Sequence, residues 1–290
     1  MPMSAMAAAL AAVLAWSSAF VGIGFALRAV PPGQLVLLRF LVASACFAAL
    51  AATGRVRRPA LRHLPALILL GLIGQVAYQL ALSAAQTRIT AGEAGVLIAL
   101  VPALAALLAV PVLGERLSGR GWTGMTLAFA GAALIGAASA GDGLRFEPMM
   151  LLGFGAAAAS ATYFVFQKSW MDRYGALDLT AYGVWTGAAA MLVFAPGLPQ
   201  TLSAASTPTL LAVIYLGVVP TALGYALWAY ALARAPAGRV SSLLYIEPLA
   251  TFALAWPLLG EVPSTMTLLG AAMALGGVIL VNVAVAPSKQ

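Results

Sequence analysis

The chain has 290 residues but few side chains of the kind that carry out catalysis, since it contains one cysteine and one histidine. The single cysteine, Cys46, cannot form an intramolecular disulfide, and its apolar surroundings predict a packing role. His63 lies among loop arginines, where we expect a solvated side chain without catalytic partners. An intramembrane enzyme needs a nucleophile beside a base or a metal cluster, so the sequence disfavours an enzyme and predicts neither a metal nor a cofactor.

Charged residues are also scarce. They make up 8% of the chain against 63% hydrophobic residues, and the mean hydropathy is +1.00. A soluble domain is roughly 25% charged, so this composition predicts an integral membrane protein. The N-terminus lacks the basic segment of a secretory leader, and its apolar run continues to a full spanning length, which predicts a first transmembrane helix.

Ten apolar runs of about 20 residues, the length that a spanning helix needs, lie between the charges and the proline and glycine turns. They cover residues 4–27, 33–53, 64–86, 93–113, 121–140, 149–169, 179–197, 208–233, 238–259 and 266–286. The predicted fold class is therefore all-α and integral membrane, with ten transmembrane helices.

One motif occurs twice. Its pattern is Pro, eight residues, Pro, one residue, Leu-Gly-Glu, two residues and Ser, and it begins at Pro102 and at Pro248, an offset of 248 − 102 = 146 residues. The chain is therefore a duplication with five helices in each half. Because five is odd, the second copy must enter the bilayer from the opposite side, and we expect two inverted five-helix repeats, residues 1–140 and 141–290.

Basic residues gather in alternate loops. With the N-terminus inside, the cytoplasmic loops and tail carry Arg55, Arg57, Arg58, Arg62, Arg116, Arg120, Lys168, Arg173, Arg234, Arg239 and Lys289. The outer loops hold Arg28, Arg88 and Arg145. This asymmetry predicts that both termini are cytoplasmic. The net charge of +7 then reflects topology and attraction to anionic headgroups, so we expect membrane lipid, and not nucleic acid, as a partner.

The repeated motif also places prolines and acids in the helices. Pro102 and Pro248 lie near mid-helix, where each deprives the carbonyl four residues earlier of its usual donor, so we expect kinks in two helices that border a cavity. Glu115 and Glu261 fall at helix ends, where we expect a structural capping or bridging role, with gating as the alternative.

Two charged residues lie within predicted spans. Glu247 precedes Pro248, and its repeat mate is Val101, so the duplication does not explain it. An acid near the midplane is costly and marks a functional site, so we expect Glu247 to tune coupling or gating, with a protonated helix tie as the alternative. Arg39 is the one base clearly inside a span; it either snorkels outward or pairs within the bundle, and it is the second candidate for coupling or gating.

Polar and aromatic side chains recur on one face of several predicted helices. Gln75, Tyr78, Gln79 and Gln86 form a helical stripe, and the offset of 146 maps Thr221 and Tyr225 onto Gln75 and Gln79. Lipid cannot satisfy a stripe of glutamines, so this face points inward, onto another helix or, as we expect, onto a cavity. The predicted substrate-binding residues are Trp16, Ser17, Gln75, Tyr78, Gln79, Tyr163, Gln167, Tyr225, Trp228 and Tyr245.

With these features the chain resembles the EamA-type branch of the drug/metabolite transporter superfamily. The likeness rests on five-helix halves that each close with Leu-Gly-Glu and a glycine-rich helix, on the Trp-Ser-Ser-Ala-Phe segment at residues 16–20, on Arg39, and on Glu247 before Pro248. The chain is most similar to bacterial inner-membrane exporters of aromatic amino acids. The resemblance implies a central cavity lined by the first, third, fourth, sixth, eighth and ninth helices, which leaves Arg39 on a peripheral helix.

The sequence therefore predicts a transporter that exports neutral, aromatic or large apolar amino acids across the bacterial inner membrane by alternating access. One alternative is broad export of drugs or other small metabolites, with Glu247 as the counter-charge. Another is a scaffold or flippase-like subunit, which solute flux into liposomes would distinguish. Two repeats in one chain predict a competent monomer, although Gly270 and Ala274 form a small-residue face that can pair chains.

Overall fold

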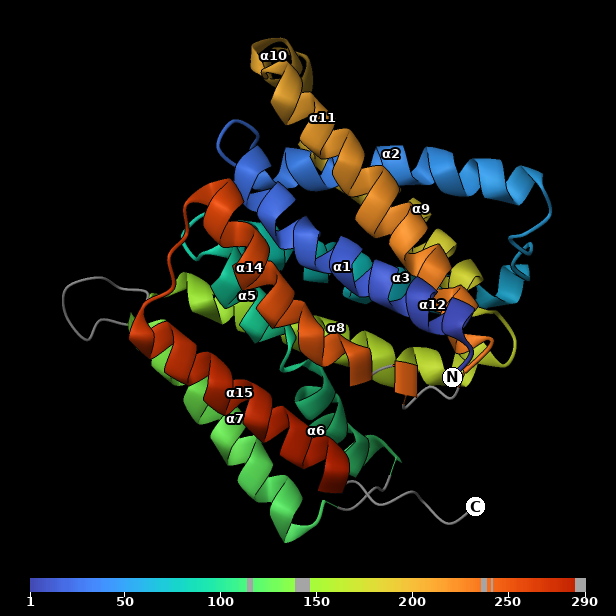
Figure 1. Ribbon diagram of the computed structural model, residues 1–290. Helices are drawn as coiled ribbons and strands as arrows, with labels where there is room; N and C mark the ends of the chain where they lie inside the picture. The colour runs from blue at the N-terminus through green and yellow to red at the C-terminus, as the bar shows by residue number, and fades with distance from the viewer. Residues whose placement is uncertain (114–116, 139–146, 236–238, 241, 285–290) are drawn as a thin grey trace.

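The computed structural model describes residues 1–113, 117–138, 147–235, 239–240 and 242–284, and all regular secondary structure in these ranges is helical. Seven helical segments in the described ranges are long and apolar enough to cross a membrane, and two shorter apolar helices lie at Leu243–Leu259 and Thr265–Val281. The protein is therefore a multi-pass helical membrane protein (Figure 1).

Each of the ten apolar runs contains at least one helix. The first half holds α1 (Met3–Ala26), α2 (Pro32–Ala52), η1 (Leu61–His63), α3 (Leu64–Gly71), η2 (Leu72–Ala77), α4 (Tyr78–Ala85), α5 (Ala91–Ile98), α6 (Val101–Leu113) and α7 (Gly119–Ala138). The second half holds α8 (Met149–Met171), α9 (Ala176–Met191), η3 (Leu192–Phe194), α10 (Leu198–Ala204), α11 (Thr207–Leu216), η4 (Gly217–Leu223), α12 (Gly224–Leu232), η5 (Ser242–Ile246), α14 (Glu247–Leu259) and α15 (Thr265–Ala284).

The two motif prolines mark breaks in their helices, and not kinks. α5 ends at Ile98 and α6 begins at Val101, so that Pro102 is the second residue of α6. In the second half the 3₁₀ segment η5 ends at Ile246, and Pro248 is the second residue of α14. A proline is tolerated in the first turn because the N–H of that position has no partner within the helix. The interruption therefore occurs at the same place in both halves.

Both halves also contain a π-helical turn at equivalent positions. These turns are η2 and η4, and the first residue of η2 maps into η4 because 72 + 146 = 218. In η4 the sequence supplies a cause, since Pro220 has no N–H to donate to the carbonyl of Leu216. π turns shift backbone carbonyls off the α-helical ladder and occur frequently at functional sites.

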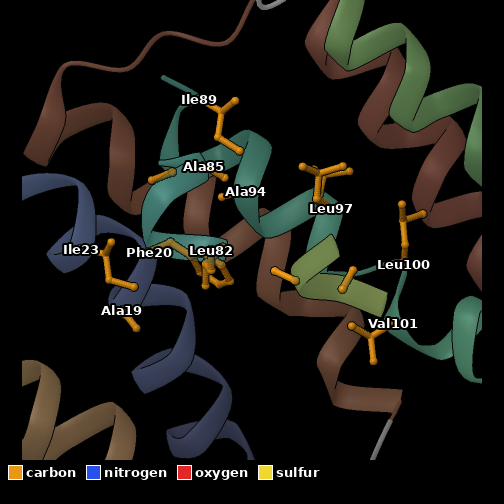
Figure 2. Close-up of a cluster of buried hydrophobic side chains, with 14 of the residues drawn as sticks. Ala19, Phe20, Ile23, Leu82, Ala85, Ile89, Ala94, Leu97, Leu100 and Val101 are labelled. Atoms are coloured by element: carbon orange, nitrogen blue, oxygen red, sulfur yellow. The ribbon is translucent and has the colours of Figure 1, made fainter. Parts of the chain in front are cut away.

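The main apolar core joins side chains of α1, α4 and α5, and α8 packs against α4 and α5. Figure 2 shows Phe20 of α1 against Leu82 of α4, with Leu97 of α5 nearby. A capping box fixes the start of α5, because the Thr90 hydroxyl accepts from the Glu93 N–H and the Glu93 carboxylate accepts from the Thr90 N–H. This core fixes α1 against α5 and α4 against α8, and so positions the polar faces of α1 and α4.

α7 and α15, the last helix of each half, pack together along their length at the margin of the molecule (Figure 1). Their backbones touch: a Cβ built on Gly131 would lie 2.5 Å from the carbonyl oxygen of Gly270, and one on Gly124 would lie 2.6 Å from that of Gly277. Small residues permit this approach in membrane helix pairs. The face of Gly270 and Ala274, a candidate for pairing two chains, is therefore covered by α7 of the same chain.

The loop between α2 and α3 folds back onto the ends of α8 and α9. The Nε atom of Arg57 lies 3.6 Å from Oδ2 of Asp178, and the Arg57 N–H donates to the same carboxylate. His63 is buried, with Nδ1 2.8 Å from the Tyr174 hydroxyl and Nε2 3.2 Å from Nη1 of Arg173. The prediction of a solvated His63 is wrong, because these contacts remove its ring from solvent.

Candidate functional site

Arg39 of α2 lies in a buried polar cluster that joins three helical segments. Its side chain is 4% exposed. Nε donates to Oγ1 of Thr221 in η4 over 2.7 Å, and Nη1 donates to Oε1 of Gln79 in α4 over 3.0 Å. Although α2 runs along the margin of the molecule in Figure 1, this side chain points inward. Of the two alternatives for Arg39, pairing within the bundle therefore describes its contacts, because the side chain reaches the predicted polar stripe from a peripheral helix.

The sequence of η4 explains how Thr221 comes to hold Arg39. Because Pro220 has no N–H, the carbonyl of Leu216 loses the donor that an α-helix would give it. The Thr221 hydroxyl donates to this carbonyl over 2.8 Å, and its oxygen accepts the N–H of Arg39. Neither Pro220 nor Thr221 is among the predicted site residues, although a proline inside an apolar run, followed by a threonine, signals this arrangement.

Trp16 of α1 forms an aromatic cluster with Tyr225 and Trp228 of α12. Its ring centroid lies 5.2 Å from that of Tyr225 and 5.1 Å from that of Trp228, with the planes tilted. The indole N–H donates to the carbonyl of Pro220 over 2.9 Å. Gly224 leaves room for the indole, since a Cβ there would lie 2.9 Å from Nε1 of Trp16. All three aromatic side chains are half-buried, so parts of their rings remain accessible.

Tyr225 connects the aromatic cluster to the polar cluster. Its side chain interacts with that of Gln75, and both Tyr225 and Tyr78 lie within electrostatic range of Arg39 and Glu247. The Oε1 atom of Gln75 is buried and has no hydrogen-bond partner among the described residues. An unsatisfied buried acceptor costs about 1–3 kcal/mol, so a donor placed there would be stabilised.

Glu247 is the first residue of α14 and is half-buried. Its carboxylate makes no ion pair within the described ranges, where Arg57 and Asp178 form the one ion pair. The helix dipole favours an anion at this position. Tyr245, two residues earlier in η5, packs against the main apolar core. Glu247 thus lies within electrostatic range of Tyr78, and no basic side chain of a described residue lies within 4.0 Å of its carboxylate.

Three other predicted residues lie on α1 and α8, and two of them contact another helical segment. Ser17 is fully buried, and its hydroxyl lies 3.1 Å from the backbone carbonyl of Glu247, so that it ties α1 to α14. Tyr163 of α8 is buried against Gly74 of η2. Gln167 lies one turn further along α8 and is half-buried. None of these three belongs to the hydrogen bonds that join Arg39 to its partners.

The polar stripe contacts other helices in this conformation. Gln79 accepts from Arg39, and Nε2 of Gln86 donates to the Phe20 carbonyl of α1 over 2.8 Å. The sequence left two alternatives for this face, contact with another helix or with a cavity, and these two glutamines contact other helices. A cavity of about 580 Å³ lies elsewhere, at the end of α8, where it is lined by Ser169, Trp170, Asp172 and Arg173.

Glu261 links the end of α14 to the start of α5. Gly260 ends α14 in the left-handed region with φ of +73°. The next residue, Glu261, accepts the N–H of Ala91 over 2.9 Å through Oε2. Burial raises the pKa of Glu261 above its ordinary value, and hydrogen bonds from Ala91 and Gly92 oppose that shift. The repeat mate Glu115 lies outside the described residues.

Comparison with known proteins defines the class and then the family. The described helices and the matched sequences indicate a membrane transporter rather than an enzyme. The model of the EamA-like transporter family matches residues 3–137 and again residues 147–283. The chain belongs to the EamA-like transporter family.

Several relatives match over most of their length. A probable terminal-alkyne amino-acid exporter of Streptantibioticus cattleyicolor is 34% identical over 93% of this chain and 90% of its own. An uncharacterized transporter of Bacillus subtilis is 33% identical over 91% and 86%, and a probable amino-acid metabolite efflux pump of Salmonella typhimurium is 30% identical over 94% and 92%. A solved crystal structure is similar with a TM-score of 0.63 and 25% identity, covering 98% of both chains.

Proposed function

We propose that this protein exports neutral amino acids with aromatic or large apolar side chains from the cytoplasm across the bacterial inner membrane. The observation that carries this proposal is the aromatic cluster of Trp16, Tyr225 and Trp228, which Tyr225 links to the neutral polar side chain of Gln75. The names of two relatives, an amino-acid exporter and an amino-acid metabolite efflux pump, support the same class of substrate.

The cluster matches the chemistry of such a substrate. Aromatic pairs contribute about 0.5–1.5 kcal/mol beyond the burial of their area, and the half-buried rings of Trp16 and Trp228 offer accessible surface for such a pair. Gln75 carries a buried acceptor with no hydrogen-bond partner among the described residues, which suits an ammonium group. A solute with an apolar ring and a zwitterionic end would therefore contact both parts of the site.

The architecture that supports transport is ten helices in two inverted five-helix repeats, residues 1–140 and 141–290, around a central cavity. The family model matches once in each half. The packing of helices is equivalent in the two halves, in which α8 is the counterpart of α1. α1 packs on α12 as α8 packs on α4, and α1 packs on α14 as α8 packs on α6. Such pseudosymmetry permits alternating access by exchange of the two arrangements. Both repeats lie in one chain, so a monomer surrounded by lipid is sufficient.

Glu247 is the proposed coupling or gating residue. It lies at the start of α14, directly after the break in the second half, and is half-buried without an ion pair to a described residue. Exchange of a proton or a cation at this carboxylate changes the charge beside Tyr78. That change would bias the position of α14 and so the side to which the site opens.

Broad export of cationic drugs is the second candidate, favoured by the same unpaired carboxylate of Glu247 near Tyr78 and Tyr225. Cations bind over aromatic faces and beside carboxylates. This candidate predicts that organic cations compete with amino-acid transport and that Glu247→Gln abolishes the competition. The amino-acid proposal predicts little competition by organic cations in the wild-type protein.

Substitution of the aromatic residues tests the amino-acid proposal. Trp228→Ala and Tyr78→Ala remove surface that would contact the substrate side chain, so both should weaken phenylalanine flux into proteoliposomes more than threonine flux. The matched control is Trp256→Ala, since Trp256 lies in α14 and is 62% exposed. Equal losses of the two fluxes in the site variants would contradict an aromatic-selective pocket.

A further inference from the structure

Arg39 is a buried cation whose observed partners are neutral. The guanidinium donates to a threonine hydroxyl and to a glutamine carbonyl oxygen, the side chains of Thr221 and Gln79. Within the part of the chain that the structure describes, no carboxylate lies within 4.0 Å of it, because the one ion pair there joins Arg57 and Asp178. A guanidinium at membrane depth is costly unless an anion or several acceptors compensate it.

The guanidinium is held in one orientation with donors left over. Thr221 fixes Nε, and it is itself fixed by its bond to the Leu216 carbonyl. Gln79 takes one donor of Nη1. The second terminal nitrogen, Nη2, makes no hydrogen bond to a described residue. A guanidinium with free terminal N–H groups is the preferred protein ligand for a carboxylate, since it donates from a planar fork.

We propose that Arg39 binds the carboxylate of the transported amino acid, which makes it a substrate-binding residue and not a gating residue. This assignment rests on the proposed function. It accounts for the unpaired charge, since the missing anion arrives with the substrate. Gln75, on the same helical stripe as Gln79, has a buried acceptor without a described partner, which complements the ammonium of the same molecule. Tyr225 interacts with Gln75 and contacts the ring of Trp16 with tilted planes, so the substrate side chain lies toward the aromatic cluster.

The charge of the site also selects among anions. A single buried arginine balances one carboxylate, whereas a phosphate group carries nearly two charges and favours a pair of basic residues.

Arg39 is 4% exposed, so the site is closed in this conformation and the substrate reaches it in another state of the transport cycle. The two hydrogen bonds of Arg39 span α2, α4 and η4, so binding at this residue is communicated to both halves of the chain.

Competition between matched ligands tests the assignment. The full chain is reconstituted in proteoliposomes, and exchange of labelled tryptophan is inhibited by tryptophan, by its methyl ester, or by tryptamine, which lacks the carboxylate. Loss of a hydrogen-bonded charge predicts that the ester and the amine inhibit about 10- to 100-fold more weakly in the wild-type protein. In Arg39→Gln the three inhibitors should become nearly equal, and Arg39→Lys should keep part of the difference.

The ratio of inhibitors is measured within each variant, so it does not depend on how much of a variant folds. If Arg39→Gln shows no exchange, thermal stabilisation of the wild-type protein by tryptophan against its methyl ester supplies the comparison. Arg88→Gln, at an exposed loop position, is the matched control and should keep the wild-type ratio. Equal inhibition by acid and ester in the wild-type protein, or an unchanged ratio in Arg39→Gln, would overturn the assignment alone. Absence of exchange with every amino acid would instead overturn the proposed function and the assignment together.

Discussion

Two neighbouring glycines of α15 provide a stringent test of the contact between α7 and α15. A Cβ on Gly277 would lie 2.5 Å from the carbonyl oxygen of Gly124 and 2.8 Å from Cα of Ala128, whereas one on Gly276 would meet no atom within 4 Å. Alanine at either position gains the same helix propensity, about 1 kcal/mol over glycine. The backbone of α7 cannot move aside as a flexible side chain would, so Gly277→Ala also carries an overpacking cost of about 1–3 kcal/mol.

The difference between the two variants isolates that steric cost, because the propensity gain cancels. We expect Gly276→Ala to be stabilised and Gly277→Ala to be less stable than it by about 1–3 kcal/mol. The measurement is thermal unfolding of the purified full chain in one detergent, followed by tryptophan fluorescence. Equal melting temperatures for the two variants would refute the close approach of α7 and α15.

Three further predictions concern the site and the topology. Thr221→Val removes the hydroxyl that bonds both Nε of Arg39 and the Leu216 carbonyl, so the free energy of unfolding should fall by about 1–3 kcal/mol. Thr126→Val removes a similar bond at an exposed position and should change the free energy of unfolding little, and equal effects of the two variants would contradict the buried network. Glu247→Gln keeps the size but not the ionisable proton, so transport should lose its dependence on pH; an unchanged pH profile would assign Glu247 a structural role. A reporter at the C-terminus that fluoresces only in the cytoplasm should be bright, and a dark reporter that is active in the periplasm would contradict the ten-helix topology.

The helices follow from the sequence because spanning length and loop charge are local properties. Each apolar run contains a helix, and the interruptions before Pro102 and Pro248 lie where the prolines lead us to expect irregular backbone. The short helix α10 lies between two predicted spans, in a segment too short and too rich in turn residues to show a helical period. The missed π turn of η4 does have a signal, since Pro220 lies inside an apolar run.

The direction of Arg39 does not follow from the sequence. A membrane helix is apolar on the face toward lipid and on the face toward protein, so hydrophobic periodicity does not define which side of α2 points inward. Only the packing of α2 against α9 and η4 brings Arg39 to Thr221. His63 was missed for a similar reason, because its burial depends on Tyr174 and Arg173, which lie more than 100 residues away in the chain.

The sequence indicates which aromatic residues belong to the site but not how they are arranged. Tyr225 and Trp228 stand on one face of a predicted helix, and Trp16 lies in a segment that the family resemblance identifies. Their contact depends on the packing of α1 against α12. The sequence repeat indicates that this packing is equivalent to that of α8 against α4, but it does not predict that either pair of helices is in contact. Residue types therefore indicate the chemistry of the site, and tertiary packing decides which of them meet.

Counterflow in proteoliposomes tests the central claim most directly. Vesicles that contain the purified full chain are loaded with unlabelled tryptophan, phenylalanine or threonine and diluted into the labelled amino acid, with protein-free vesicles as the control. An exporter of aromatic amino acids predicts transient accumulation of labelled tryptophan and phenylalanine, with weaker accumulation of threonine and none in the control. No accumulation of any neutral amino acid above the control would contradict the proposed function.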